Sequence, residues 1–334
     1  MTTTKLQRIL IGVLAVQLIL AVIIFLPRRG AAGTTAPLLG EVKAEEISSL
    51  TIHDDQGKTI RLAKAASGWT LPDAGDYPAD ATKITPVLSK LLALKTGRPA
   101  TTTAASHARL QVADDKFVRK LDVAASGGAS KTLYFGSSAG AGATHVRLAG
   151  QNDVFLSSGL STWELTADAA SWIDTRYVNV TQADVTGFSL ANANGQLSFT
   201  KDAAGAWKLD GLAAGETVNA SAITGLLSQA TQLRMMRPLG KDNQPAYGLD
   251  KPTAMVTLKT KNDNQEKTIT LAVGAKDATD SSYVVKSSDS AYYVRIAEYS
   301  VKDLVEKKRG DFLQAPPIAQ PPLGTPAVTP TAVK

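Results

Sequence analysis

The residues best suited to proton transfer or metal binding near neutral pH are the three histidines, His53, His107 and His145. A metal centre or an acid–base pair needs several histidine, cysteine or carboxylate groups gathered together, but these histidines stand far apart in the sequence. His145 falls in a strand-like pattern that aligns with Tyr283 of a later, similar stretch. We interpret the histidines as structural, with metal ligation as the alternative, and predict no metal site.

Three aspartates, Asp73, Asp76 and Asp80, occur close together and raise the question of a calcium site. The Asp-x-Asp-x-Asp-Gly spacing of a calcium-binding loop is missing, so the carboxylates lack the register that would direct them at one ion. Aspartate strongly favours turns and helix N-termini, where its side chain accepts from free backbone N–H groups. We therefore assign turn and capping roles, with Asp80 as the N-cap of a helix that begins at Ala81.

The glycine-rich stretch Gly136–Gly142 has the small residues that let a backbone cradle a phosphate. It matches neither the dinucleotide-binding fingerprint nor the P-loop, so a loop between two strands of a hairpin is the better interpretation. The sequence also has no HExxH motif, and we predict no catalytic residue and no cofactor-binding residue. Because distant residues can converge in a fold, a hydrolase with an unrecognised site stays as a lesser alternative.

The tryptophans Trp69 and Trp207 could stack on a ligand, but their spacing of 138 positions indicates an internal duplication. Other landmarks recur at a spacing of 139, namely Ile84-Thr85-Pro86-Val87-Leu88 with Ile223-Thr224-Gly225-Leu226-Leu227, and Arg98-Pro99 with Arg237-Pro238. A period this long indicates two domain-sized copies. Because both copies place the tryptophan at the end of a short strand before a helix, we expect its ring to pack in the core or between sheet and helix.

Each copy predicts a β-meander, then an amphipathic helix, then further strands. In the first copy apolar residues recur at three- and four-residue spacing over residues 84–94, and the second copy repeats this helix face over residues 223–233. Asn219 takes the capping position in the second copy. Pro86 lies within the first helical pattern, so that helix either begins at Thr85 or kinks at the proline.

The second half of each copy alternates strand-like runs with turns rich in small residues. Residues 160–174 then predict one helix or two short ones at the end of the first copy. Residues 301–308 predict the closing helix of the second copy.

The chain begins with the pattern of a membrane anchor. Ile9–Leu26 is apolar apart from Gln17, and its 18 positions would span about 27 Å as a helix, close to the ~30 Å hydrocarbon core. A cleaved signal peptide and a buried core helix are the alternatives, but the run exceeds the usual signal length and ends in Pro27-Arg28-Arg29. A short tail before a large body indicates that residues 1–8 lie in the cytoplasm and the body outside.

Composition excludes several functional classes. The chain carries 36 Lys and Arg against 30 Asp and Glu, a formal net charge of +6. Residues 1–40 hold four of the basic residues and no acidic one, so the body is nearly neutral and lacks the basic surface that a nucleic acid requires. The absence of cysteine excludes disulfides and thiolate chemistry.

A further set of landmarks carries a family resemblance. They are Gly68-Trp69-Thr70-Leu71, Pro78-Ala79-Asp80 and Arg98-Pro99 in the first copy, and Tyr247-Gly248-Leu249-Asp250-Lys251-Pro252, Val273-Gly274, Tyr283-Val284 and Tyr292-Tyr293-Val294 in the second. From Val42 to Leu313 the chain resembles, in two copies, a bacterial family known as domain of unknown function 4340. The resemblance implies a membrane-anchored protein whose partners are components of an ABC-type transporter of the gliding-associated kind. The first copy departs from the pattern, since His107-Ala108-Arg109-Leu110 stands where Ala246-Tyr247-Gly248-Leu249 stands in the second.

We therefore expect an α+β protein with an N-terminal transmembrane helix and two homologous, mostly antiparallel sheet domains, each with a packed helix. The expected segments are a cytoplasmic tail (1–8), a transmembrane anchor (9–26), a spacer (27–40), a first repeat domain (41–179), a second repeat domain (180–314) and a Pro-rich disordered tail (315–334).

The expected function is that of a non-catalytic, extracytoplasmic binding or scaffold protein of the cell membrane, accessory to an ABC-type transport complex. Its bilayer contact would run through residues 9–26, and neither a cofactor nor a nucleic-acid partner is expected. The alternative is a module that binds envelope glycan or a small ligand in a cleft between the copies, where Trp163, Trp172 or Tyr177 would supply aromatic rings.

Overall fold

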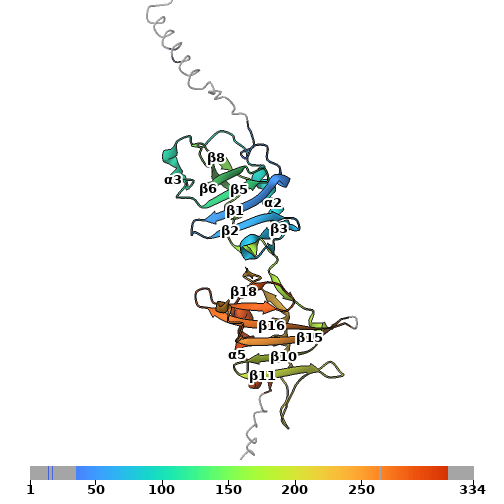
Figure 1. The fold of residues 1–334 in the computed structure, drawn as a ribbon. Coiled ribbons are helices and arrows are strands. Elements are labelled where there is room, and N and C mark those ends of the chain that lie inside the picture. Colours follow the sequence, from blue (N-terminus) through green and yellow to red (C-terminus); the bar gives the residue numbers. More distant parts are fainter. Residues whose placement is uncertain (1–13, 15–16, 18–34, 263–264, 315–334) are drawn as a thin grey trace, which may run out of the picture. The chain divides into compact units, whose positions relative to one another are not determined.

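The computed structural model describes residues 35–262 and 265–314, together with Leu14 and Gln17. Within these residues the strands form two eight-stranded sheets and one two-stranded sheet (Figure 1). Their ladders are antiparallel, and few helices accompany them. The expected α+β class with two mostly antiparallel sheet domains is confirmed.

The described chain divides into two compact units, and each unit is built from two separate stretches of the sequence. The first unit comprises Met1–Trp69 and Ala81–Asp168, as far as these residues are described. The second comprises Thr70–Asp80 together with the chain from Ala169 onward. A segment of the first repeat is therefore part of the second unit, where Tyr77 packs edge-on against Tyr292 with ring centroids 4.7 Å apart.

The first sheet has the strand order β4-β3-β2-β1-β5-β6-β7-β8. Its strands are β1 (Ile47–Asp54), β2 (Thr59–Ala65), β3 (Gly68–Leu71), β4 (Tyr77–Pro78), β5 (Arg119–Ala125), β6 (Ser130–Gly140), β7 (Ala143–Leu148) and β8 (Val154–Ser157). The helical elements in the first half of the chain are η1 (Ala44–Glu46), η2 (Pro72–Ala74), α2 (Ala81–Leu92), η3 (Ala104–Ser106), α3 (His107–Leu110) and η4 (Ala169–Ser171).

The second sheet has the order β12-β11-β10-β15-β16-β17-β18-β14. Its strands are β10 (Val185–Asn192), β11 (Gly195–Lys201), β12 (Trp207–Leu209), β14 (Arg237–Gly240), β15 (Ala254–Asn262), β16 (Gln265–Asp277), β17 (Ser282–Ser287) and β18 (Tyr293–Ala297). β9 (Arg176–Asn179) and β13 (Gln232–Arg234) form the small sheet. The helical elements are η5 (Gln182–Asp184), α4 (Ala220–Thr231), η6 (Pro245–Tyr247), α5 (Glu298–Glu306) and η7 (Arg309–Phe312).

The two sheets repeat one topology. A meander, β1–β3 or β10–β12, pairs through its first strand with a second run of antiparallel strands, β5–β8 or β15–β18. The edge strand β14 pairs with β18 from Arg237 to Gly240, and in the first unit the bridge Thr101↔Val154 takes the place of Gly240↔Tyr293. The predicted duplication thus holds in the pairing of the strands as well as in the sequence.

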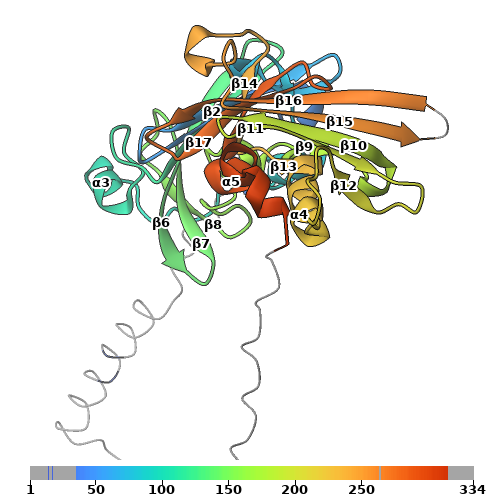
Figure 2. The same cartoon turned by 90° about the horizontal axis from the view of Figure 1, so that it is seen from below.

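The helices of the two repeats bury the predicted apolar faces. In α2 the side chains of Ile84, Val87, Leu88 and Leu91 are buried, and in α4 those of Ile223, Leu226 and Leu227 are buried. Each such side chain contributes about 1.5–3 kcal/mol relative to exposure. Figure 2 shows α4 and α5 side by side, and α5 contacts strands from β10 to β18 of the second sheet.

The ends of these helices follow the predicted capping pattern in the second repeat. The Asn219 side chain accepts from the backbone N–H of Ala222 at 3.2 Å, which confirms its role as N-cap of α4. The first-repeat helix α2 begins at Ala81, directly after Asp80, and continues through Pro86. The helix therefore starts earlier than the alternative at Thr85.

The C-terminal segments of the two repeats differ in structure. Only the single 3-10 turn η4 forms in the stretch 160–174, so the expectation of a terminal helix or two short helices there was wrong. The second repeat forms α5 and η7 in the corresponding place, close to the predicted closing helix.

Among the residues that the structure describes, no helix has the length and apolar character needed to cross a membrane. The expected anchor, 9–26, lies outside these residues apart from Leu14 and Gln17, and the expected tail 315–334 lies wholly outside them.

Candidate functional site

The three histidines lie apart, and each bonds a neighbour in its own part of the first unit. His53 on β1 lies between Asp122 and Thr59, at 3.0 and 2.9 Å. The other two histidines contact backbone carbonyl oxygens. Nε2 of His107 lies 2.9 Å from the carbonyl oxygen of Asn152, and Nδ1 of His145 lies 2.8 Å from that of Ser137. Within the described ranges no group of three or more His, Asp or Glu side chains is placed to hold a metal ion.

The aspartates Asp73, Asp76 and Asp80 lie in the connection between β3 and α2. Asp73 is part of η2, and Asp76 has a left-handed backbone with φ 58°. The Thr70 hydroxyl donates to Asp76 at 3.4 Å. These positions agree with the predicted turn roles of the first two residues.

The stretch Gly136–Gly142 forms the end of β6 and the turn into β7, which confirms the hairpin interpretation. Gly140, Ala141 and Gly142 have positive φ angles of 85°, 47° and 76° in that turn. Gly136 is required for packing and not for the turn, because a Cβ at this position would stand 2.1 Å from the carbonyl oxygen of Leu110. Its missing side chain allows one backbone to lie directly against another.

The tryptophans named in the sequence differ in exposure. Trp69 on β3 and Trp207 on β12 are both half-buried at equivalent strands, and Trp207 packs edge-on against Phe188 at 5.3 Å. Trp172 is only 2% exposed and cannot stack on a ligand, whereas Trp163 is 76% exposed. The Tyr177 hydroxyl lies inside the second unit, where it donates to the Tyr292 carbonyl and accepts from the N–H of Ser287, both at 2.8 Å.

A hollow of about 310 Å³ in the first unit is the best candidate for a ligand site, and we call it the first-unit hollow. It lies between the C-terminal end of α2 and the ends of β7 and β8. Its apolar wall includes Leu38, Leu94 and Val146, and its polar wall includes Lys90, Lys95 and Ser157. Apolar walls with a few polar groups are typical of small-molecule sites.

Ser157, which lines the hollow, faces another small polar residue across the strands. Thr144 on β7 and Ser157 on β8 are cross-strand partners, and both are buried. In the second repeat the same place on β17 and β18 holds the pair Tyr283 and Ile296. The counterpart of Tyr283 is therefore Thr144, and the alignment of His145 with Tyr283 was wrong by one position. Both of these larger side chains are buried, and α5 contacts the two strands that bear them.

Ser157 is the polar residue of the first-unit hollow that lacks an internal partner. Its side chain is 9% exposed, and its Oγ has no hydrogen-bond partner among the described residues. Buried polar atoms are almost always bonded, so such an exception requires an explanation. Sequence reasoning missed Ser157, although alignment of the repeats at a spacing of 139 would have shown that Ile296 is its counterpart in the second repeat.

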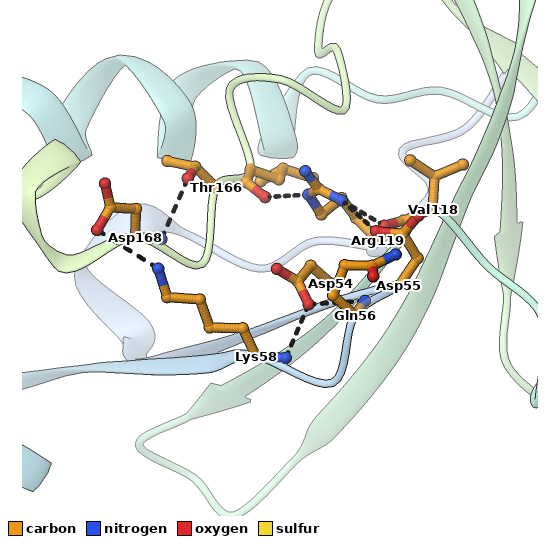
Figure 3. A network of polar contacts seen from close by, with 9 residues as sticks. Asp54, Asp55, Gln56, Lys58, Val118, Arg119, Thr166 and Asp168 are labelled. Carbon is orange, nitrogen blue, oxygen red and sulfur yellow. Dashed lines mark hydrogen bonds and ion pairs between the residues drawn. The ribbon is translucent and has the colours of Figure 1, made fainter. Parts of the chain in front are cut away.

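Residues 165–168 are held by a polar network (Figure 3). Arg119 donates from Nε to the carbonyl of Leu165 at 2.9 Å, and its Nη1 lies 3.5 Å from Asp55. Lys58 pairs with Asp168 at 3.6 Å. The network ties residues 165–168 to the β1–β2 hairpin, so its charges have a structural purpose.

A second hollow, of about 570 Å³, lies in the second unit between β9, β15 and β16. Its wall includes Asn179, Thr181 and Thr260, and also Lys267 and Asp289. The ammonium of Lys267 lies 2.6 Å from the Asp289 carboxylate. The cation of this hollow is thus neutralised within the protein, which makes it the weaker candidate.

Comparison with known proteins identifies a family. The model of the family described as Domain of unknown function (DUF4340) matches residues 69–220 and again residues 207–315. No curated protein and no solved structure matches the chain. The two matches agree with the two repeats that the strand pairing shows.

Proposed function

Because the chain belongs to the DUF4340 family, in two tandem copies, we propose that it is a membrane-anchored, non-catalytic binding or scaffold protein whose body lies outside the cytoplasm. In this proposal it is accessory to a membrane transport complex of the ABC type. The observation that carries the proposal is the order of the chain, in which the apolar run Ile9–Leu26 precedes the two copies. A tether followed by paired sheet domains suits a protein that holds a partner near the bilayer.

The polar clusters of the body support a holding role. The charges of Arg119, Lys58 and Asp168 tie one segment to another. The guanidinium of Arg147 is 5% exposed, donates to the carbonyls of Val112 and Gln151 at 2.6 and 3.2 Å, and also pairs with Asp114. These charged groups are engaged with one another or with backbone carbonyls, which supports a structural role for them.

The tether and its orientation can be tested in cells that express the full chain. We expect the protein in the membrane fraction, resistant to extraction by carbonate and released by detergent. Protease added to spheroplasts should digest the body while a cytoplasmic control protein survives. Recovery of the intact chain from the cytosol would refute the anchored part of the proposal.

The partner can be sought by crosslinking in intact cells, followed by purification under denaturing conditions and mass spectrometry. We expect crosslinks to integral subunits of a transporter. A matched chain whose residues 9–26 are replaced by an unrelated anchor of equal length controls for chance encounters in the membrane. Crosslinks that involve only copies of this chain would contradict the accessory role.

A second candidate function is binding of envelope glycan, and the specific observation in its favour is Trp163, which is 76% exposed. An exposed ring can stack on a sugar face, as aromatic rings do at many recognition surfaces. Cosedimentation of the full chain with purified cell-wall glycan tests this idea. Trp163→Ala should abolish pelleting and Tyr299→Ala, at an 80% exposed aromatic of the second unit, should leave it intact. Equal pelleting of both variants would exclude Trp163 as the contact.

A further inference from the structure

We infer that the first-unit hollow binds a small amphipathic carboxylate. The carboxylate would lie between the Lys95 ammonium and the Ser157 hydroxyl, and a short hydrocarbon chain would lie against Leu38, Leu94 and Val146. This site is separate from the proposed scaffold function, and either can fail without the other.

The first support is the buried hydroxyl of Ser157. Its Oγ lacks a protein partner. Ser157 lies on the same face of the sheet as its cross-strand partner Thr144 and as Val146, a lining residue two positions further along β7. A buried hydroxyl without a partner is unfavourable, and a ligand oxygen that accepts from it would satisfy it. A carboxylate offers that acceptor.

The second support is charge. The charged residues that line the hollow are Lys90 and Lys95, and no acidic side chain lines it. Lys90 is neutralised by an ion pair with Glu164, which lies outside the lining. Lys95 is exposed and has no ion pair within the described part of the chain. One free ammonium matches a single negative charge.

The C-terminal end of α2 also borders the hollow, and free helix carbonyls would repel an anion. Several of these carbonyls are already occupied. The N–H groups of Ala93 and Leu94 donate to Ser89 and Leu91 at 3.1 and 3.2 Å, and the N–H of Leu38 donates to Leu94 at 2.7 Å. The free charge of Lys95 is therefore the main electrostatic feature of the hollow.

The third support is the size and the apolar wall. A volume of about 310 Å³ lies at the lower end of the range for small-molecule sites. Leu38 and Leu94 are buried at 5% exposure, and Val146 at 1%, so they form a fixed surface rather than mobile side chains. A chain of several methylene groups would bury apolar area there, which favours binding.

The second repeat shows how the hollow can be filled without loss of the fold. Ile296 stands in place of Ser157, and its side chain is fully buried in an otherwise equivalent sheet. Ser157→Ile should therefore close the hollow and satisfy the packing at the same time. Lys95→Gln removes the free charge at an exposed position and leaves the wall unchanged.

Calorimetric titration of the full chain in zwitterionic lipid nanodiscs, with empty nanodiscs as the blank, tests the site with hexanoate as the probe. We expect saturable binding of hexanoate at least tenfold tighter than that of acetate, which lacks the tail, and of hexanol, which lacks the charge. Ser157→Ile should abolish binding. Lys95→Gln should weaken hexanoate at least fivefold and leave hexanol unchanged.

Lys251→Gln, at an exposed lysine of the second unit, is the matched control and should bind hexanoate as the unmodified chain does. Thermal unfolding of each variant verifies that the fold is intact. If Ser157→Ile unfolds the protein, Lys95→Gln alone decides. Absence of saturable hexanoate binding, or equal binding by Lys95→Gln, would overturn the inference, as would inorganic phosphate binding more tightly than hexanoate.

Discussion

The carbonyl oxygen of Leu110 lies so close to the backbone of Gly136 that a Cβ on this glycine would stand only 2.1 Å from it. The second repeat contains the same approach, where a Cβ on Gly274 would stand 2.1 Å from the carbonyl oxygen of Tyr247. In both units the segment before the long hairpin therefore packs directly on the hairpin's first strand. Glycine is the residue that permits this distance, because real Cβ atoms do not approach other atoms so closely.

We predict that Gly136→Ala destabilises the first unit by about 2 kcal/mol or more, since a backbone cannot move aside as a flexible side chain can. Gly274→Ala should do the same to the second unit. Hydrogen exchange by mass spectrometry on the full chain would show faster exchange in β6 for the first variant and in β16 for the second.

Gly127→Ala is the control for these variants, because a Cβ there meets no atom within 4 Å and the backbone φ is not positive. Its exchange pattern should match that of the unmodified chain. Unchanged protection of β6 in Gly136→Ala would show that the close approach is not fixed in solution.

A second relationship joins Asp54 and Arg119, which are cross-strand partners on β1 and β5. Arg119 Nε donates to the carbonyl of Leu165 at 2.9 Å. In the second repeat the corresponding partners are Asn192 and Ala254, and Asn192 Nδ2 donates to the carbonyl of Leu304 at 3.1 Å. The same carbonyl position is bonded in both repeats, but the donor has changed strands.

This exchange of donors predicts a rescue. Arg119→Ala should cost the first unit about 1.5–3 kcal/mol, as expected for loss of a charged donor to a part-buried carbonyl. Adding Asp54→Asn should recover about 1 kcal/mol, because the new amide can donate where Asn192 donates and its oxygen can still accept from the N–H groups of Gln56 and Lys58. Chemical denaturation of the four chains of this double-mutant cycle measures the recovery. An additive cycle would refute the equivalence of the two carbonyls.

The sequence predicted those parts of the fold that local signals determine. The Asn219 cap, the apolar faces of α2 and α4, and the hairpin at Gly136–Gly142 each follow from residue type and spacing. The path of residues 160–174 was missed because local helical periodicity does not show the tertiary contacts of this segment, among them those of Arg119 with Leu165 and of Lys58 with Asp168.

The alignment of the repeats before the long hairpin was also shifted by two positions. Left-handed backbone occurs at Gln111, φ 57°, and at Gly248, φ 65°, so Leu110-Gln111-Val112 occupies the place of Tyr247-Gly248-Leu249. The glycine expected in a left-handed turn is absent from the first copy, which removed the signal that would have set the register. The first-unit hollow was missed because it is lined by residues from separate parts of the chain, such as Leu38, Lys95 and Ser157, which local patterns do not bring together.

Gly225 offers a stabilising substitution. It lies within α4, where a Cβ would meet nothing within 4 Å. Gly225→Ala should raise the free energy of unfolding of the second unit by about 0.5–1 kcal/mol, because alanine has the higher helix propensity. Thermal or chemical denaturation of the full chain measures the gain. A loss of stability would show that α4 needs the glycine for a contact outside the described residues.

Tyr77 provides a test of the second unit at high pH. Burial, with a contribution from the negative charge of Asp174, raises the pKa of the Tyr77 phenol from 10.0 to about 12. The folded unit therefore holds this proton more tightly than the unfolded chain does. The resulting stability is fully present below pH 10 and is lost as the pH rises from 10 through about 12.

Carbon-13 labelling of the tyrosine rings allows the titration of Tyr77 to be followed by NMR, with Tyr77→Phe to assign the signal. We expect a midpoint near 12 and an alkaline loss of stability that is shallower in Tyr77→Phe. Tyr77 also packs edge-on against Tyr292, so Tyr292→Ala should open the site to water and lower the Tyr77 pKa towards 10. A midpoint near 10 in the unmodified chain would mean that the segment Thr70–Asp80 does not pack within the second unit in solution, because burial there is the main cause of the shift.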